Sequence, residues 1–182
     1  TALVFEILWS RLFVTVFGNS SYAISVVLCA YMAGLGFGSW LGGWLADRTR
    51  RWLLFYAGIE AAVGLWALLI PLVLAGLLRW VPEVSLLAPD QSLLVSSSLR
   101  FLISLAILFV PCTLMGATLP LLVRFCSESR GVVGPIVGTL YGINTVGAAM
   151  GCFVAGYWML EVFGLSGTNQ AAVSVNLLLG AS

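Results

Sequence analysis

The chain has 182 residues, of which 61% are hydrophobic and only 8% are charged, and its formal net charge is +1. A soluble domain carries roughly 25% charged residues, so this composition predicts an integral membrane protein. The near-zero net charge excludes a nucleic-acid reader, which needs a basic face.

Metal and redox chemistry are not expected from this composition. The sequence has no histidine, which is the commonest zinc ligand and the usual axial ligand of haem. The cysteines lie apart with no CxxC spacing, so we expect small apolar filler rather than a metal or redox site. Their positions are Cys29, Cys112, Cys126 and Cys152. We therefore expect no cofactor.

Both ends of the chain lie inside apolar stretches, at Thr1 and Ser182. We expect a segment of a longer protein that forms a single transmembrane domain over 1–182, with no soluble domain. The first stretch contains Glu6 and Arg11 and lacks a basic leader region and a cleavage site, so we do not expect a signal peptide.

Apolar segments follow one another along the chain at about the 20-residue length that a membrane-spanning helix needs, the first being short. We expect spans over 1–17, 22–45, 52–78, 99–125, 135–160 and 168–182. The expected connections are 18–21, 46–51, 79–98, 126–134 and 161–167. No strand-like alternation of sufficient length occurs. The expected fold class is therefore all-α, a polytopic bundle of six spans.

Arginines concentrate in the connections after the second and fourth spans. They are Arg48, Arg50, Arg51, Arg124 and Arg130. The positive-inside rule places such loops in the cytoplasm. We therefore expect a multi-pass protein of the cytoplasmic (inner) membrane, with both ends of this chain on the cytoplasmic side.

Glycines in the second segment recur every four residues, at Gly34, Gly38 and Gly42, and so share one helix face. Small residues at this spacing let a neighbouring helix approach closely. A nucleotide loop is the weaker interpretation, because no strand precedes these glycines. The fifth segment repeats the pattern. Its small-residue positions are Gly138, Gly142, Gly147 and Gly151.

The stretch Gly43-Trp-Leu-Ala-Asp47-Arg48-Thr-Arg50-Arg51 resembles the loop between helices two and three of the major facilitator superfamily. The resemblance implies a cytoplasmic latch that stabilises one state of a rocking transporter, and a six-span chain like one half of that fold. The alternative is a plain positive-inside loop. A complete transporter of the superfamily pairs two halves. This chain would then need a second helical half, a homodimer or a larger membrane complex.

Several motifs in order carry a second resemblance. They are Glu6–Arg11 (EILWSR), Gly18–Ala23 (GNSSYA), Gly34–Ser39 (GLGFGS), Gly116–Leu122 (GATLPLL) and Leu140–Ala148 (LYGINTVGA). Together they resemble the membrane region of bacterial membrane-integral spermidine synthase-like proteins, in which a major facilitator-like bundle is fused to a synthase domain. The resemblance implies a polyamine-related function. The family's catalytic residues belong to the synthase domain and have no counterpart here, so we expect no catalytic residue in this chain.

Polar residues inside membrane spans are candidates for function. We hypothesise that Glu6 and Glu60, with Tyr141 and Asn144, form a site for a cationic solute such as a polyamine. The alternative is that they tie helices together, at about 1 kcal/mol or less each. Arg11 lies about 140° from Glu6 on an ideal helix, so it is a poor partner for Glu6. Glu60 could pair with Arg11 or take up a proton.

Three functions remain as alternatives from the sequence. The first is a membrane module of a spermidine synthase-like protein. The second is a half-size major facilitator-like transporter that acts as a dimer. The third is a structural subunit of a larger membrane protein complex. Each of them places the chain in the lipid bilayer.

Overall fold

The computed structural model describes residues 2–17, 20–87, 93–130 and 133–181, and these are helical except at the short connection 49–51. The helices are α1 (Ala2–Phe17), α2 (Ser20–Arg48), α3 (Trp52–Leu87), α4 (Leu93–Arg130), α5 (Val133–Val154) and α6 (Leu160–Ala181), with a π-helical turn, η1 (Ala155–Met159), between the last two. Within the described residues no strand occurs. The expected all-α class is confirmed.

Stretches of the described chain are long and apolar enough to cross a membrane. They are Ile24–Arg48, Trp52–Gly76, Phe101–Glu128 and Val133–Ala181. The protein is therefore a helical membrane protein with four such candidates. Helix α1 has 16 residues, which is short of the roughly 20 that a span needs.

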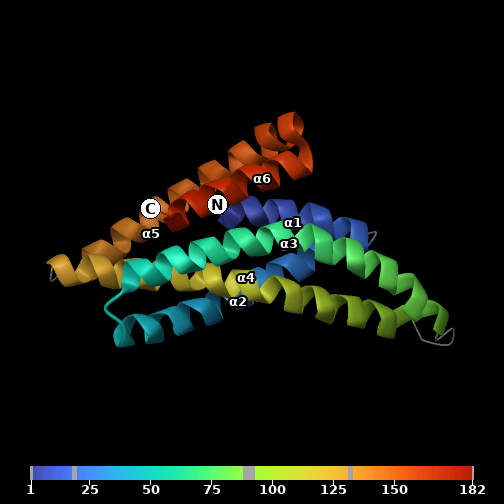
Figure 1. Ribbon diagram of the computed structural model, residues 1–182, viewed down its shortest axis with the longest axis horizontal. Helices are drawn as coiled ribbons and strands as arrows, with labels where there is room; N and C mark the ends of the chain where they lie inside the picture. Colours follow the sequence, from blue (N-terminus) through green and yellow to red (C-terminus); the bar gives the residue numbers. More distant parts are fainter. Residues whose placement is uncertain (1, 18–19, 88–92, 131–132, 182) are drawn as a thin grey trace.

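The chain reverses within the last of these stretches, at Gly164. Its backbone angles, φ 64° and ψ −173°, lie in a region that only glycine adopts readily. Residues 133–163 therefore run outward and residues 165–181 run back toward the bundle, where α6 packs against α3; Figure 1 shows the reversal at the orange-to-red tip.

Helices run further than the loop signals in the sequence suggest. Helix α2 extends through Arg48, α3 extends to Leu87, and α4 extends from Leu93 to Arg130. The expected loop over 79–98 is wrong, because only 88–92 lie outside the described residues. The expected connections 46–51, 126–134 and 161–167 are likewise shorter, and α2 already begins at Ser20. Polar side chains mark where the chain leaves the lipid, and a helix with internal hydrogen bonds can continue past that point.

The bundle is built on two close helix pairs. Helices α2 and α4 lie side by side in Figure 1 and pack most tightly where α2 carries glycine. Helices α3 and α6 run antiparallel, because Gly180 meets Ala57 while Asn169 of the same helix reaches Ala67. The Trp66 indole donates to the Ile107 carbonyl at 3.2 Å and so connects α3 to α4.

Helix α1 lies in the interior and α5 lies outside. The α1 side chains Phe5, Leu8, Trp9 and Phe13 have no exposed surface. By contrast, no residue of α5 is buried. The sequence pattern would not have distinguished these two helices, because both are predominantly apolar. The two helices differ in their position in the bundle, because α1 lies between other helices and α5 lies on the outside.

Candidate functional site

Glu6 lies half-buried on α1. Its carboxylate is within electrostatic range of Tyr31 on α2 and Cys112 on α4. Among the described residues Glu6 forms no ion pair with an arginine. The carboxylate therefore sits among three helices with its charge uncompensated by a basic side chain.

Tyr31 and Cys112 lie near Glu6 because α2 and α4 pack closely against each other. A Cβ added to Gly34 would lie 2.4 Å from the Cys112 Cβ, so only glycine fits there. Tyr31 precedes Gly34 by about one turn and shares its helix face. The Tyr31 side chain is only 5% exposed and Cys112 only 1%. The Gly34 contact thus places the phenol and the thiol on the interior side of the pair.

Glu60 lies half-buried on α3, one helical turn after Tyr56. The two side chains interact electrostatically. An ion pair of Glu60 with Arg11 was one alternative from the sequence. The described residues do not form it, and Arg11 is exposed. Glu60 therefore has a tyrosine as neighbour, as Glu6 does.

Tyr141 and Asn144 lie on the outward helix α5. Tyr141 is 61% exposed, and Asn144 is also exposed. In the described part of the chain no hydrogen bond joins either of them to Glu6 or Glu60. The structure places the two carboxylates in the bundle and the other two candidates on its outer surface.

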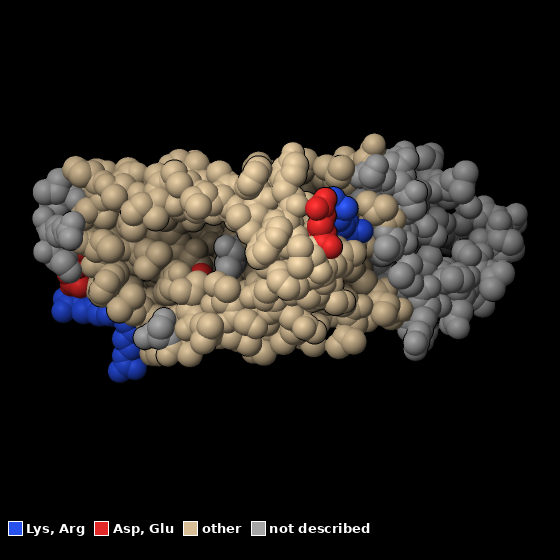
Figure 2. All heavy atoms as spheres, turned by 90° about the horizontal axis from the view of Figure 1, so that it is seen from above, with Lys and Arg blue, Asp and Glu red and all other residues tan. Residues whose placement is uncertain are grey.

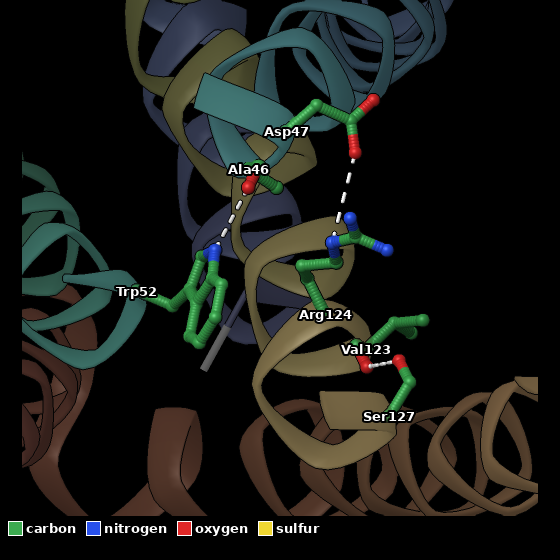
Figure 3. A network of polar contacts seen from close by, with 6 residues as sticks. All are labelled: Ala46, Asp47, Trp52, Val123, Arg124 and Ser127. Atoms are coloured by element: carbon green, nitrogen blue, oxygen red, sulfur yellow. Dashed lines mark hydrogen bonds and ion pairs between the residues drawn. The ribbon is translucent and has the colours of Figure 1, made fainter. Parts of the chain in front are cut away.

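The arginine-rich end of the bundle joins α2 to α4. Arg124 Nε lies 3.7 Å from Asp47 Oδ1, and the Trp52 indole donates to the Ala46 carbonyl at 2.8 Å (Figure 3). The Arg48 guanidinium lies 3.7 Å from the centre of the Trp44 ring. The first of these contacts joins α2 to α4 and the second joins α2 to α3, whereas the third lies within α2.

A polar hollow of about 330 Å³ lies at this end, lined by residues of α2, α3, α4 and the start of α5. Its charged lining side chains are Asp47, Arg50, Arg124 and Glu128. Arg50 and Arg51 are exposed, and Gly43 has open space beside it. Figure 2 shows charged side chains at one end of the visible face and at one further place along it, with a hollow that has an acidic side chain at its base.

The glycine positions divide into two groups. Added Cβ atoms at Gly34, Gly38 and Gly42 would lie within 3 Å of α4 atoms. On α5, by contrast, Gly147 faces open space, and Gly151 meets only the Val4 side chain, at 3.3 Å. The α2 glycines thus form a tight helix contact, while most of the α5 stripe is uncovered.

The described residues contain no group of three or more metal-ligating side chains. All four cysteines are free; Cys112 is buried, Cys29 is exposed, and the other two are intermediate. The described site chemistry is thus that of carboxylates and phenols.

Comparison with protein-family models, with curated proteins and with solved structures finds no match to this chain.

Sequence reasoning missed Tyr31, Tyr56 and the ion pair of Asp47 with Arg124. Two of these had a local signal. Tyr56 precedes Glu60 by four residues, which is the spacing of side chains that meet on a helix. Tyr31 precedes the first packing glycine by three residues. The ion pair had no signal, because it joins residues far apart in the chain.

Proposed function

We propose that this chain is the polyamine-related membrane module of a spermidine synthase-like protein, held in the inner membrane with its arginine-rich end in the cytoplasm. The observation that supports it best is the pair of half-buried carboxylates, Glu6 and Glu60, without an arginine partner in the described residues. An ionisable group at membrane depth is costly and is usually kept for a ligand, ion or proton. A polyammonium chain supplies the missing positive charge.

The proposal includes six spans arranged like one half of a major facilitator fold. The reversal at Gly164 supports this arrangement, because it divides the stretch Val133–Ala181 into two antiparallel helices. Counting α1, six helical passes would then follow one another. Both ends of the chain would lie on the same side of the membrane.

A half-size transporter that acts as a dimer is the second candidate. The uncovered helix α5 favours it, because Gly138, Gly142 and Gly147 have nothing within 4 Å of an added Cβ. Glycine in a membrane helix usually marks a place where another helix packs. A second copy could pack on this face and complete a central site.

Thermal unfolding of the purified protein in detergent tests the proposed ligand. A ligand that binds only the folded state stabilises it by about RT ln(1 + [L]/Kd). We expect spermidine to raise the unfolding temperature of the wild type, and Glu6→Gln or Glu60→Gln to abolish the rise. Glu161→Gln is the matched control, because Glu161 is an exposed carboxylate outside the bundle interior.

The outcomes separate the candidates. Equal shifts in the wild type and all three variants would show that spermidine does not use these carboxylates. No shift with any polyamine in a well-folded sample would favour a structural subunit of a larger complex. Uptake of a solute by reconstituted dimers, without a polyamine effect, would favour the half-size transporter.

A further inference from the structure

We infer that the polar hollow at the arginine-rich end binds the headgroup of a phospholipid that carries both a phosphate and a primary ammonium, as phosphatidylethanolamine does. The inference goes beyond the proposed polyamine function and does not depend on it. It concerns a separate site, because neither Glu6 nor Glu60 lines this hollow.

The hollow lies where candidate membrane spans begin and end. The stretches Ile24–Arg48 and Phe101–Glu128 finish beside it, and the stretches Trp52–Gly76 and Val133–Ala181 start beside it. Charged side chains and tryptophan collect at the boundary between hydrocarbon and water, where lipid headgroups lie. A headgroup of the adjacent leaflet is therefore always within reach of the hollow.

The hollow has the size and the walls of a ligand site. Its volume is about 330 Å³, at the lower end of the range of about 300–1,000 Å³ for ligand pockets. Two of its lining residues, Trp52 and Ser127, are buried. The Trp52 indole donates to the Ala46 carbonyl, and the Ser127 hydroxyl donates to the Val123 carbonyl (Figure 3). These hydrogen bonds hold the walls in place before a ligand arrives.

The charged lining contains two side chains of each sign. Arg124 and Asp47 lie 3.7 Å apart and partly neutralise each other. Arg50 and Glu128 also line the hollow, and neither forms an ion pair with another described residue. One guanidinium and one carboxylate are therefore left for a ligand, and the groups that they bind must have opposite charges.

The phosphate matches the arginine side of the hollow. A guanidinium donates two parallel hydrogen bonds to phosphate oxygens, and Arg50 supplies one. Arg124 has terminal N–H donors besides the Nε that faces Asp47. The Thr49 hydroxyl oxygen accepts the Arg51 backbone N–H at 3.2 Å, which leaves the hydroxyl hydrogen as a further donor in the hollow.

Glu128 distinguishes among phospholipids. A primary ammonium has three N–H donors and forms charge-assisted hydrogen bonds with a carboxylate. A choline group has no N–H donor and is bound by cages of aromatic rings, whereas Trp52 is the single ring among the described lining residues. A glycerol headgroup brings no cation to Glu128. An ethanolamine headgroup therefore matches the hollow better than either.

The test compares phospholipids that have the same acyl chains and different headgroups. The full chain, freed of lipid in detergent, is titrated with phosphatidylethanolamine, phosphatidylcholine or phosphatidylglycerol, and bound lipid is counted by native mass spectrometry. We expect the ethanolamine lipid to bind at least about tenfold more tightly than the other two, which is the effect of one additional charge-assisted hydrogen bond. Equal affinities for the three lipids would overturn the inference.

Variants assign the two halves of the headgroup, and both residues are exposed, so the bundle should fold without them. Glu128→Gln should weaken the ethanolamine lipid about tenfold and leave the glycerol lipid unchanged. Arg50→Gln should weaken both lipids, and Arg50→Lys should restore part of the affinity because the charge remains. The matched controls are Glu161→Gln and Arg11→Gln, which remove exposed charges that do not line the hollow. Equal losses in variants and controls would overturn the site.

A soluble compound separates the two sources of this chemistry. O-phosphoethanolamine carries the same phosphate and ammonium without acyl chains. We expect it not to displace the lipid at equal concentration, because it lacks the apolar chains that pack on the spans. Displacement at equal concentration would overturn the assignment to a lipid.

Failure of this inference differs from failure of the proposed function. We expect Glu6→Gln and Glu60→Gln to leave the lipid affinities unchanged, because both residues lie away from the hollow. If polyamines have no effect while the headgroup preference is observed, the polyamine proposal falls and the lipid site stands. If spermidine binds but the three lipids bind equally, the lipid site falls alone.

Discussion

Glycine 38 shows how a single residue determines the distance between two helices. An added Cβ there would lie 2.0 Å from the Thr113 carbonyl oxygen, a backbone atom that cannot rotate away. Gly116 does the same from the opposite side, since its Cβ would lie 2.4 Å from the Leu35 carbonyl oxygen. The contact between α2 and α4 is therefore made by backbone, and Ser39 adds a hydrogen bond to the Gly116 carbonyl at 3.1 Å.

Gly38→Ala should destabilise the bundle by about 1–3 kcal/mol or more, because overpacking forces the helices apart. Gly43→Ala on the same helix is the control, since an added Cβ there meets nothing within 4 Å. Alanine is the better helix former, so this control should be neutral or slightly stabilising. Unfolding by SDS titration in mixed micelles measures both variants. Equal stabilities would contradict the close approach.

Trp52 offers a second test, which concerns a single hydrogen bond between α2 and α3. Its buried indole N–H donates to the Ala46 carbonyl across the turn between α2 and α3. Trp52→Phe keeps an aromatic ring but loses this bond, so we expect a loss of about 0.5–1.5 kcal/mol in unfolding free energy. Trp40→Phe is the control, because Trp40 is 65% exposed and donates no described hydrogen bond. A loss of the same size in the control would contradict the role of the bond.

The candidate site could be predicted in part from single residues. Glu6 and Glu60 are conspicuous because each is a carboxylate within an apolar segment. Their aromatic partners were not predicted. Tyr31 becomes a neighbour of Glu6 only through the crossing of α1 and α2, which depends on packing rather than on sequence spacing. Asn144 satisfied the same sequence criterion as the carboxylates, yet its helix lies outside.

At the scale of elements, the ends of helices were the least predictable feature. The proline and serine residues over 79–98 predicted a long loop, whereas α3 and α4 extend into most of it. Loop residues and interfacial helix residues have similar composition, because both meet water and headgroups. The glycine spacing in α2, in contrast, depends only on helix periodicity, and Gly34, Gly38 and Gly42 all face α4.

The ion pair of Asp47 with Arg124 lies at the ends of α2 and α4 and should contribute little to stability. Its side chains are 71% and 52% exposed, and exposed pairs are worth about 0.2–1 kcal/mol. In a double-mutant cycle of Asp47→Asn and Arg124→Gln, we expect a coupling energy below about 1 kcal/mol that decreases in high salt. A larger coupling that is insensitive to salt would show that the pair is enclosed, as a latch requires.

For the whole molecule, the reversal at Gly164 makes a topological prediction. If residues 133–163 cross the membrane, Ser166 lies on the opposite side from Thr49. Single cysteines at these positions, in a background with the native cysteines replaced by alanine, should react with a membrane-impermeant maleimide from opposite sides of oriented vesicles. Thr49→Cys should react from the cytoplasmic side. Labelling of both from one side would contradict the six-span arrangement.

The π-helical turn Ala155–Met159 determines where the returning helix goes. A π turn holds one more residue than an α turn, so if the same residues were α-helical instead, everything beyond them would be rotated by about 100° around the α5 axis. The chain would still reverse at Gly164, but α6 would start in a different direction around the α5 axis. Helix α6 would then no longer pack against α3, and Asn169 would lose its hydrogen bond to the Ala67 carbonyl. This single additional residue therefore aims the last helix of the chain at its partner.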